Sequence, residues 1–216
     1  MKRLFLSLLF SCFIIGITLA QNIQFLYGYG NNKPVNFITT EFYKALDGGP
    51  LYYFTDFKID KNGYLESYTE ISKYWIISKD ENTSLTAQYN AGLNKDFQIL
   101  PVYLVGVSKS TKVNELILSL DVLYRFDKFT NTNGVQITFQ FLEYWEKLQL
   151  SGYCDVWNSG TWDTEKNQTV ILFEPQLFYK ISKRFYVGIE GRLSNYTLLA
   201  PYDNYVMFGL KWNLEN

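Results

Sequence analysis

The chain has 216 residues, with 20 basic and 21 acidic side chains and no histidine. The near balance of charge gives no reason to expect nucleic acid as a partner. The absence of histidine removes Ser-His catalysis, histidine-mediated proton transfer and most zinc sites. We therefore expect no enzyme, no cofactor and no metal site. The aromatic content of 19% favours β-strands and the aromatic belts of a bilayer interface.

Residues 1–20 have the pattern of a cleavable secretory signal. Lys2 and Arg3 are followed by an apolar stretch, Leu4–Leu19, and then by the small residue Ala20. This stretch is short for a membrane span, and polar sequence follows it closely. We expect residues 21–216 to form one mature domain in which Cys154 is the single cysteine, so that no internal disulfide forms.

After residue 20 the chain alternates between apolar and polar residues with a period of two, and polar breaks interrupt this pattern. No segment has the pattern of a helix of useful length. Twelve alternating segments follow one another in the order Ile23–Tyr29, Phe37–Lys44, Leu51–Ile59, Tyr64–Tyr74, Ser84–Leu93, Gln98–Val107, Val113–Phe126, Gly134–Leu142, Leu148–Trp157, Thr169–Ile181, Phe185–Asn195 and Tyr205–Leu214. This repeat predicts an all-β fold, a twelve-stranded antiparallel transmembrane β-barrel of the bacterial outer membrane.

The lengths of the polar breaks agree with a barrel whose two chain ends lie on the periplasmic side. In such a barrel short turns follow the even strands and longer external loops follow the odd strands. The longest breaks, 127–133, 158–168 and 194–204, all follow odd-numbered segments.

Alternation also assigns the two faces of each strand. In Phe185–Asn195, Val187 and Ile189 share one face, whereas Glu190 and Arg192 share the other. A basic side chain facing lipid near the bilayer centre costs about 2–4 kcal/mol, so the charged face is expected to point into the lumen. By the same reasoning the apolar face of the closing strand should face lipid.

The predicted lumen face supplies the candidate residues for solute binding. They are Asp56, Lys58, Asp121, Arg125, Asp155, Glu174, Gln176, Glu190, Arg192, Tyr153 and Tyr186. Glu190 and Arg192 form either a polar constriction that holds a solute or an internal charge pair that offsets burial. Tyr153 and Tyr186 either stack on a base or sugar ring or fill space.

Glu174-Pro175-Gln176 interrupts the tenth segment with a proline. Proline cannot donate a ladder hydrogen bond, so the sequence predicts either a β-bulge or an edge-like irregularity here. The bulge would either aim Glu174 and Gln176 into the pore or shape the barrel.

Several segments resemble a family of small, uncharacterised bacterial outer-membrane proteins. The segments are Tyr68–Lys73, Ser84–Leu93, Ser151–Trp157, Leu172–Tyr179, Gly188–Asn195 and Gly209–Leu214. That family is similar to the nucleoside-specific (Tsx-like) channel proteins of the outer membrane, which are monomeric twelve-stranded barrels. The resemblance implies the same fold, location and monomeric state. It also implies a nucleoside as one candidate solute, although no nucleoside-binding residue of those channels maps onto this chain.

Three hypotheses for function remain open at this point. The first is an outer-membrane channel for diffusion of small polar solutes, with outer-membrane lipid and the solute as its partners. The second is a non-transporting outer-membrane barrel with a structural or surface-interaction role through its external loops. The third is a secreted soluble barrel that binds a ligand, which would need an apolar interior that the predicted lumen does not provide.

Overall fold

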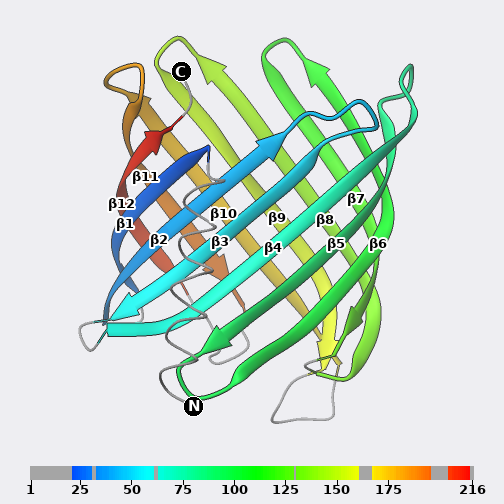
Figure 1. The fold of residues 1–216 in the computed structure, drawn as a ribbon, viewed down its shortest axis with the longest axis horizontal. Helices are drawn as coiled ribbons and strands as arrows, with labels where there is room; N and C mark the ends of the chain where they lie inside the picture. Colours follow the sequence, from blue (N-terminus) through cyan, green and yellow to red (C-terminus); the bar gives the residue numbers. More distant parts are fainter. Residues whose placement is uncertain are drawn as a thin grey trace.

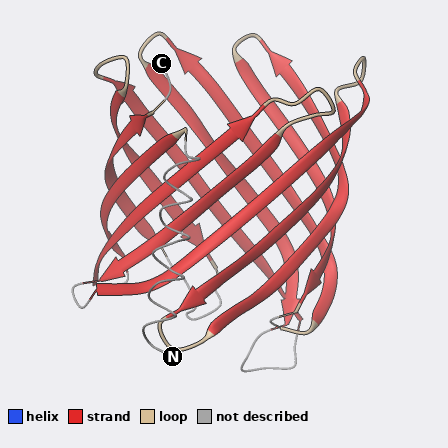
Figure 2. Cartoon of the chain, viewed as in Figure 1, coloured by secondary structure: helices blue, strands red, loops and turns tan. Residues whose placement is uncertain are grey.

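The structure is a computed structural model, and it describes residues 21–30, 33–60, 63–128, 130–160, 167–195 and 204–214. The predicted signal, residues 1–20, lies outside the described residues. Figure 2 shows that the described elements are strands joined by turns and loops. No helix in these ranges is long and apolar enough to cross a membrane.

Twelve β-strands follow one another along the chain. They are β1 (Asn22–Gly30), β2 (Lys33–Lys44), β3 (Leu51–Asp60), β4 (Gly63–Ser78), β5 (Thr83–Asn94), β6 (Gln98–Val113), β7 (Leu116–Asp127), β8 (Thr132–Trp145), β9 (Leu148–Gly160), β10 (Asn167–Lys180), β11 (Phe185–Ser194) and β12 (Tyr205–Asn213).

The strands form a single closed barrel. Each strand pairs antiparallel with its neighbours in sequence, and β1 closes the sheet by pairing with β12 from Asn22↔Asn213 to Gly30↔Tyr205. Figure 1 shows the strands running obliquely around the barrel, as closure of a sheet requires. Closure leaves no unpaired sheet edge, which is the condition for a β-structure to cross a bilayer. The predicted fold class is confirmed.

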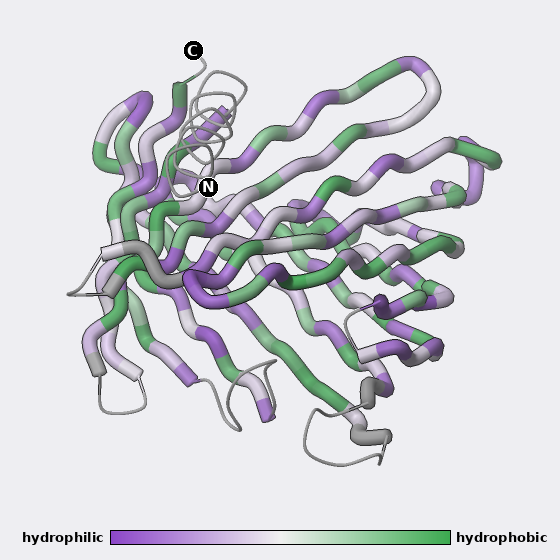
Figure 3. The backbone as a smooth tube through the Cα atoms, turned by 60° about the horizontal axis from the view of Figure 1, so that its bottom comes forward, coloured by the Kyte–Doolittle hydropathy of each residue, from purple (hydrophilic) through white to green (hydrophobic). Residues whose placement is uncertain are grey.

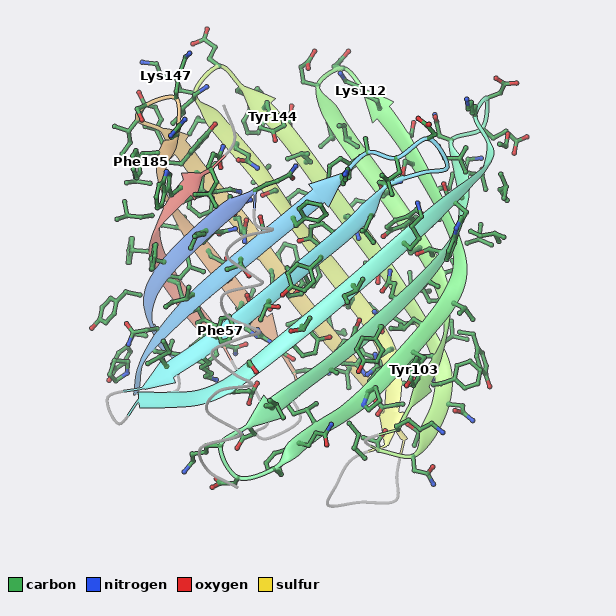
Figure 4. The ribbon with its side chains drawn as sticks, in the orientation of Figure 1. Phe57, Tyr103, Lys112, Tyr144, Lys147 and Phe185 are labelled. Atoms are coloured by element: carbon green, nitrogen blue, oxygen red, sulfur yellow. The ribbon has the colours of Figure 1, made fainter. Side chains whose placement is uncertain are left out.

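Both ends of the described chain lie at the same end of the barrel. The backbone N–H of Leu214 donates to the carbonyl of Gln21 at 2.8 Å, and that of Asn213 donates to the carbonyl of Arg184 in the β10–β11 turn, also at 2.8 Å. Figure 4 shows Lys112, near the β6–β7 turn, at this end too. We refer to it as the turn end.

The lengths of the connections follow the predicted rule only in part. The connection 195–204, after β11, is the longest. However, β9 and β10 extend into the predicted loop 158–168 and shorten it to 161–166, and β7 and β8 likewise shorten 127–133 to 128–131. The turn-end connection 45–50 is as long as 161–166. Strand pairing therefore continues into sequence that looked too polar for strands.

Residues that pair across neighbouring strands share a face, so the register identifies the inside and the outside of the barrel. Asp121 pairs with Thr138 and Thr138 with Asp155, which places three polar side chains in one inner row. The next row holds Val122 and Ile137, which are exposed on the outer face. Figure 3 shows the same alternation of hydrophilic and hydrophobic residues along the strands.

The outer face of β3 and β4 carries hydroxyl groups as well as apolar side chains. Thr55 and Thr69 form a hydrogen bond of 2.8 Å with each other, and the hydroxyl of Thr55 also donates to that of Tyr53 at 2.6 Å. Mutual pairing satisfies these polar groups where lipid offers no partner. This pairing explains how the outer face of β4, which has a weak apolar pattern, can lie against lipid.

Of the two irregularities predicted at Pro175, the structure shows no β-bulge but an edge-like interruption of one ladder. Pro175 pairs in register with Gly152 of β9, and this ladder continues on both sides without a shift. On the other side the ladder to β11 runs from Phe173↔Leu193 to Gln176↔Glu190, and the two intervening positions of β10 are not paired. The missing N–H of proline is therefore accommodated by a gap in one ladder, not by an extra residue.

Candidate functional site

One side of the barrel interior is packed with apolar side chains. The cluster comes from β10, β12, β1 and β2, with Tyr186 of β11 packed against it, and consists of Leu26, Val35, Phe37, Phe178, Tyr205 and Met207. We call this group, with Tyr186, the apolar sector. Phe178 has no exposed surface and Met207 keeps 1%. Here the interior is a small hydrophobic core and not a wet wall.

Two glycines on the inner face make room for this packing. A β-carbon at Gly209 would lie 2.3 Å from Cδ2 of Leu26, and one at Gly188 would lie 2.6 Å from a ring carbon of Phe178. Real β-carbons do not approach other atoms so closely, so a side chain at either position would displace the cluster. The glycines therefore let Leu26 and Phe178 lie flat against the strands behind them.

Two lysines extend over the apolar sector. The Nζ atom of Lys58 donates to the hydroxyl of Tyr205 at 2.7 Å and lies 4.8 Å from the centre of the same ring. The Nζ atom of Lys211 lies 5.3 Å from the ring centre of Phe178 and 3.9 Å from a carboxylate oxygen of Glu41. Both ammonium groups thus combine ring faces with a polar partner.

A network of polar side chains crosses β9, β10 and β11. The hydroxyl of Tyr153 donates to Oε2 of Glu174 at 2.6 Å, and Nη1 of Arg192 lies 2.9 Å from Oε1 of the same carboxylate. One residue pair further along, Nε2 of Gln176 donates to Oε2 of Glu190 at 2.6 Å. The ion pair observed for Arg192 is thus with Glu174 on the neighbouring strand, beside the ladder gap at Pro175.

Four other inner carboxylates come from β3, β4, β7 and β9. We call Asp56, Glu70, Asp121 and Asp155 the carboxylate sector. Asp56 and Asp155 each accept a bond of 2.5 Å from a threonine hydroxyl, and Glu70 accepts one of 3.1 Å from a serine hydroxyl. No basic side chain in the described part of the chain lies within ion-pair distance of any of the four.

Asp121 anchors contacts between strands that are not neighbours. The hydroxyl of Tyr74, on β4, donates to Oδ2 of Asp121, on β7, at 3.1 Å, and Nε2 of Gln88 approaches the same oxygen at 3.4 Å. Asp121 has no exposed surface, and its Oδ1 atom has no hydrogen-bond partner in the described structure. The side chain of Tyr74 therefore extends along the inner wall past β5 and β6.

Aromatic rings line the inner wall beside the carboxylate sector. The ring centres of Tyr52 and Phe54 are 5.9 Å apart, and those of Phe54 and Tyr68 are 6.0 Å apart. All three side chains are half-buried, as are Asp56 and Glu70 on the same strands. This side of the interior therefore keeps solvent-accessible polar and aromatic surface, in contrast to the apolar sector.

Arg125 forms a separate polar group on β7 and β8. Its Nη1 atom donates to Oε1 of Gln136 at 2.7 Å, and its Nη2 atom lies 2.9 Å from Oδ2 of Asp127. The guanidinium also lies 5.0 Å from the ring centre of Trp157. Arg125 is thus bound by its neighbours, away from the network around Glu174.

Register places all eleven sequence-predicted candidates on the inner face, but they do not form one site. Their role in solute binding remains a prediction. Sequence reasoning missed Tyr68, Tyr74 and Lys211 as members of the inner groups. Period-two alternation was the signal for all three, since Tyr68 and Tyr74 share the inner face of β4 with Glu70, and Lys211 shares that of β12 with Met207. In the described ranges no group of three or more histidine, cysteine or acidic side chains is placed to hold a metal ion.

A closed twelve-stranded antiparallel barrel with an apolar outside and a charged inside belongs to the class of porin-like β-barrels. Residues 20–213 match the family described as a domain of unknown function, DUF5020. The chain belongs to that family. A comparison of the sequence with curated proteins found no match.

Solved porin structures share the fold. The KdgM porin aligns with a TM-score of 0.57 at 10% identity, over 90% of this chain and 99% of KdgM. The KdgM porin in complex with disordered oligogalacturonate gives a TM-score of 0.58 with the same identity and coverage. The NanC porin gives a TM-score of 0.59 at 10% identity, over 89% of this chain and 99% of NanC. The likeness to nucleoside channels receives no support from these matches.

Proposed function

We propose that the protein is an outer-membrane channel through which small polar solutes diffuse. The observation that carries the proposal is the inner wall of the closed barrel. Asp56, Glu70 and Asp155 come from three strands and keep solvent-accessible surface inside the barrel. A polar wall that is wet inside a closed barrel is the feature that lets solutes cross an outer membrane.

The distribution of polarity supports a membrane location over a soluble one. Large apolar residues such as Val122, Ile137 and Phe208 are exposed on the outer face. A soluble barrel would place such residues inside, because exposed apolar surface of this extent is unfavourable in water. Export would depend on removal of residues 1–20, so mass spectrometry of the extracted protein should find Gln21 at the N-terminus. An intact Met1 would contradict this processing.

The structural matches support a small-solute channel without identifying its solute. One KdgM structure contains oligogalacturonate, which indicates that a barrel of this architecture accommodates a sugar derivative. Nucleosides remain useful as uncharged test solutes, but no residue of this chain is assigned to a nucleoside.

Conductance of the purified protein in planar bilayers tests the proposal. We expect discrete current steps after insertion, and we expect no steps from detergent alone or from protein that has not folded. Folded, inserted protein that conducts nothing would overturn the proposal. That result would favour the non-transporting barrel, an alternative to which the apolar sector lends weight because it fills one side of the interior.

A further inference from the structure

We infer that the lumen selects for positively charged solutes, in particular those that carry an ammonium group, and disfavours polyanions. The inference rests on the proposed channel function. It follows from the balance of inner charges, from the partners of each basic side chain, and from the rings beside the unpaired carboxylates.

The inner face carries more acidic than basic side chains. Register places nine acidic residues inside the barrel, namely Glu41, Asp56, Glu66, Glu70, Asp121, Asp127, Asp155, Glu174 and Glu190. It places six basic residues there, namely Lys58, Lys112, Arg125, Lys180, Arg192 and Lys211. Among the side chains that the structure describes, the formal charge of the inner wall is therefore −3, although the whole chain carries only −1.

Most of the basic groups are engaged by neighbouring residues. Arg125, Arg192 and Lys211 each lie within ion-pair distance of an inner carboxylate. Lys58 is bonded to the hydroxyl of Tyr205. Lys112, which lies 3.6 Å from Glu115, and Lys180 are both at the turn end. These positive charges are largely compensated where they lie, so they offer a passing anion little attraction.

The carboxylate sector is compensated only from a distance, because Arg192 acts on Asp56, and Arg125 on Glu70 and Asp155, from beyond ion-pair distance. Asp56 and Glu70 lie on the neighbouring strands β3 and β4, and Asp155 faces the same interior from β9 and repels Glu70 electrostatically. Asp56 in turn interacts with Glu174 of β10. Carboxylates that converge in a narrow passage with low-dielectric walls focus a negative potential, which concentrates cations and repels anions.

Aromatic rings specify the kind of cation. The half-buried rings of Tyr52, Phe54 and Tyr68 lie on the same two strands as Asp56 and Glu70. Ring faces attract weakly hydrated ammonium groups, and a nearby carboxylate adds to that attraction. Metal ions instead need several carboxylates at coordinating distance, and the described residues contain no such group.

This charge pattern distinguishes the chain from what the shared fold alone would suggest. Oligogalacturonate, the ligand of one KdgM structure, carries a carboxylate on each sugar unit. Such a chain would meet the unpaired Asp56, Glu70 and Asp155 inside this barrel. The fold is therefore shared, but we expect the charge of the preferred solute to be opposite.

The test is the reversal potential of the purified channel in a KCl gradient across a planar bilayer. We expect the reversal potential of the wild type to lie closer to the equilibrium potential of K⁺ than to that of Cl⁻. The triple variant Asp56→Asn, Glu70→Gln and Asp155→Asn changes the formal inner charge from −3 to 0, so its reversal potential should move toward zero by about half or more. Glu81→Gln, in an exposed turn, is the matched control and should leave the reversal potential unchanged.

Spermidine added to one side probes the ammonium preference. It should reduce the K⁺ current of the wild type and of the control, and reduce it less in the triple variant. If the triple variant does not fold, Glu70→Gln alone decides the result, with a smaller shift in the same direction. A wild type that conducts without cation preference, or variants that match it, would overturn the inference and leave the channel function intact. A wild type without conductance would overturn both.

Discussion

The two sides of the barrel interior differ in packing: one is a buried apolar cluster, and the other is a polar wall that keeps accessible surface. In the apolar sector, Phe178 and Met207 are as buried as residues of a soluble core. In the carboxylate sector, Asp56 and Glu70 keep accessible surface and have hydroxyl partners, but no basic side chain of the described residues lies within ion-pair distance of them. The comparison shows that an inward-facing position is not automatically a pore-lining position. Packing against neighbours decides which part of the inner wall remains open to solutes.

The strongest test of this difference in packing is to remove a large side chain from each sector. Phe178→Ala should lower the free energy of unfolding by about 3–5 kcal/mol, because it empties a packed site. Phe54→Ala is the matched control in the wet sector and should cost less, since Phe54 is only half-buried. Denaturant unfolding of both variants in lipid vesicles measures the difference. Equal losses would show that the two sectors are packed alike.

The outer face provides the next largest effect. Leu210→Arg places a charge on the lipid side of β12 and should cost about 2–4 kcal/mol, with a lower yield of inserted barrel. Gln140→Arg places the same charge on the inner face opposite Tyr153 and should be milder. Met207→Arg would not be an equally mild change, although Met207 also faces inward, because Met207 lies within the apolar sector. Similar insertion yields for Leu210→Arg and Gln140→Arg would contradict the assignment of faces.

Alternation along the sequence was sufficient to predict the strands and the faces of residues such as Asp121 and Arg192. This succeeded because the period of two is a local property of an extended backbone, and because charge on the lipid face is costly. Contacts across the interior could not be predicted in the same way. Tyr74 and Asp121 are separated by 47 residues, and Lys58 and Tyr205 by 147, so their meeting depends on closure and strand tilt.

The apolar sector was also missed, for a related reason. The inner face was expected to be polar throughout, and Leu26, Phe178 and Met207 were not assigned a common role. Their cluster depends on β1, β10 and β12 coming together when the barrel closes. Gly188 and Gly209 were the local signal, since glycine within a strand often marks the close approach of another group. An irregularity at Pro175 was predicted, but only the register of β10 with β9 and β11 distinguishes a ladder gap from a bulge.

The network between the two sectors should give an intermediate effect. Tyr153→Phe removes the hydroxyl that donates to Glu174 at 2.6 Å and leaves this buried carboxylate with one donor fewer. A hydrogen bond to a charged group contributes about 1.5–3 kcal/mol, so we expect a loss of stability in that range. Tyr27→Phe, on the exposed outer face, controls for the loss of a hydroxyl and should be close to neutral. If Tyr153→Phe is also neutral, the network does not support the wall.

The smallest expected effects come from removing a single negative charge at each sector in turn and comparing the two shifts of the reversal potential. Glu190→Gln removes a negative charge next to the apolar sector, and Glu70→Gln removes one from the carboxylate sector. Both should shift the reversal potential in a KCl gradient toward anions, because each removes a charge from the lumen. The shift should be smaller for Glu190, whose carboxylate is buried and bonded to Gln176 at 2.6 Å, whereas Glu70 is half-buried. A larger shift for Glu190→Gln would mean that ions pass along β10 and β11. The wall open to solutes would then not be the carboxylate sector, contrary to what packing indicates.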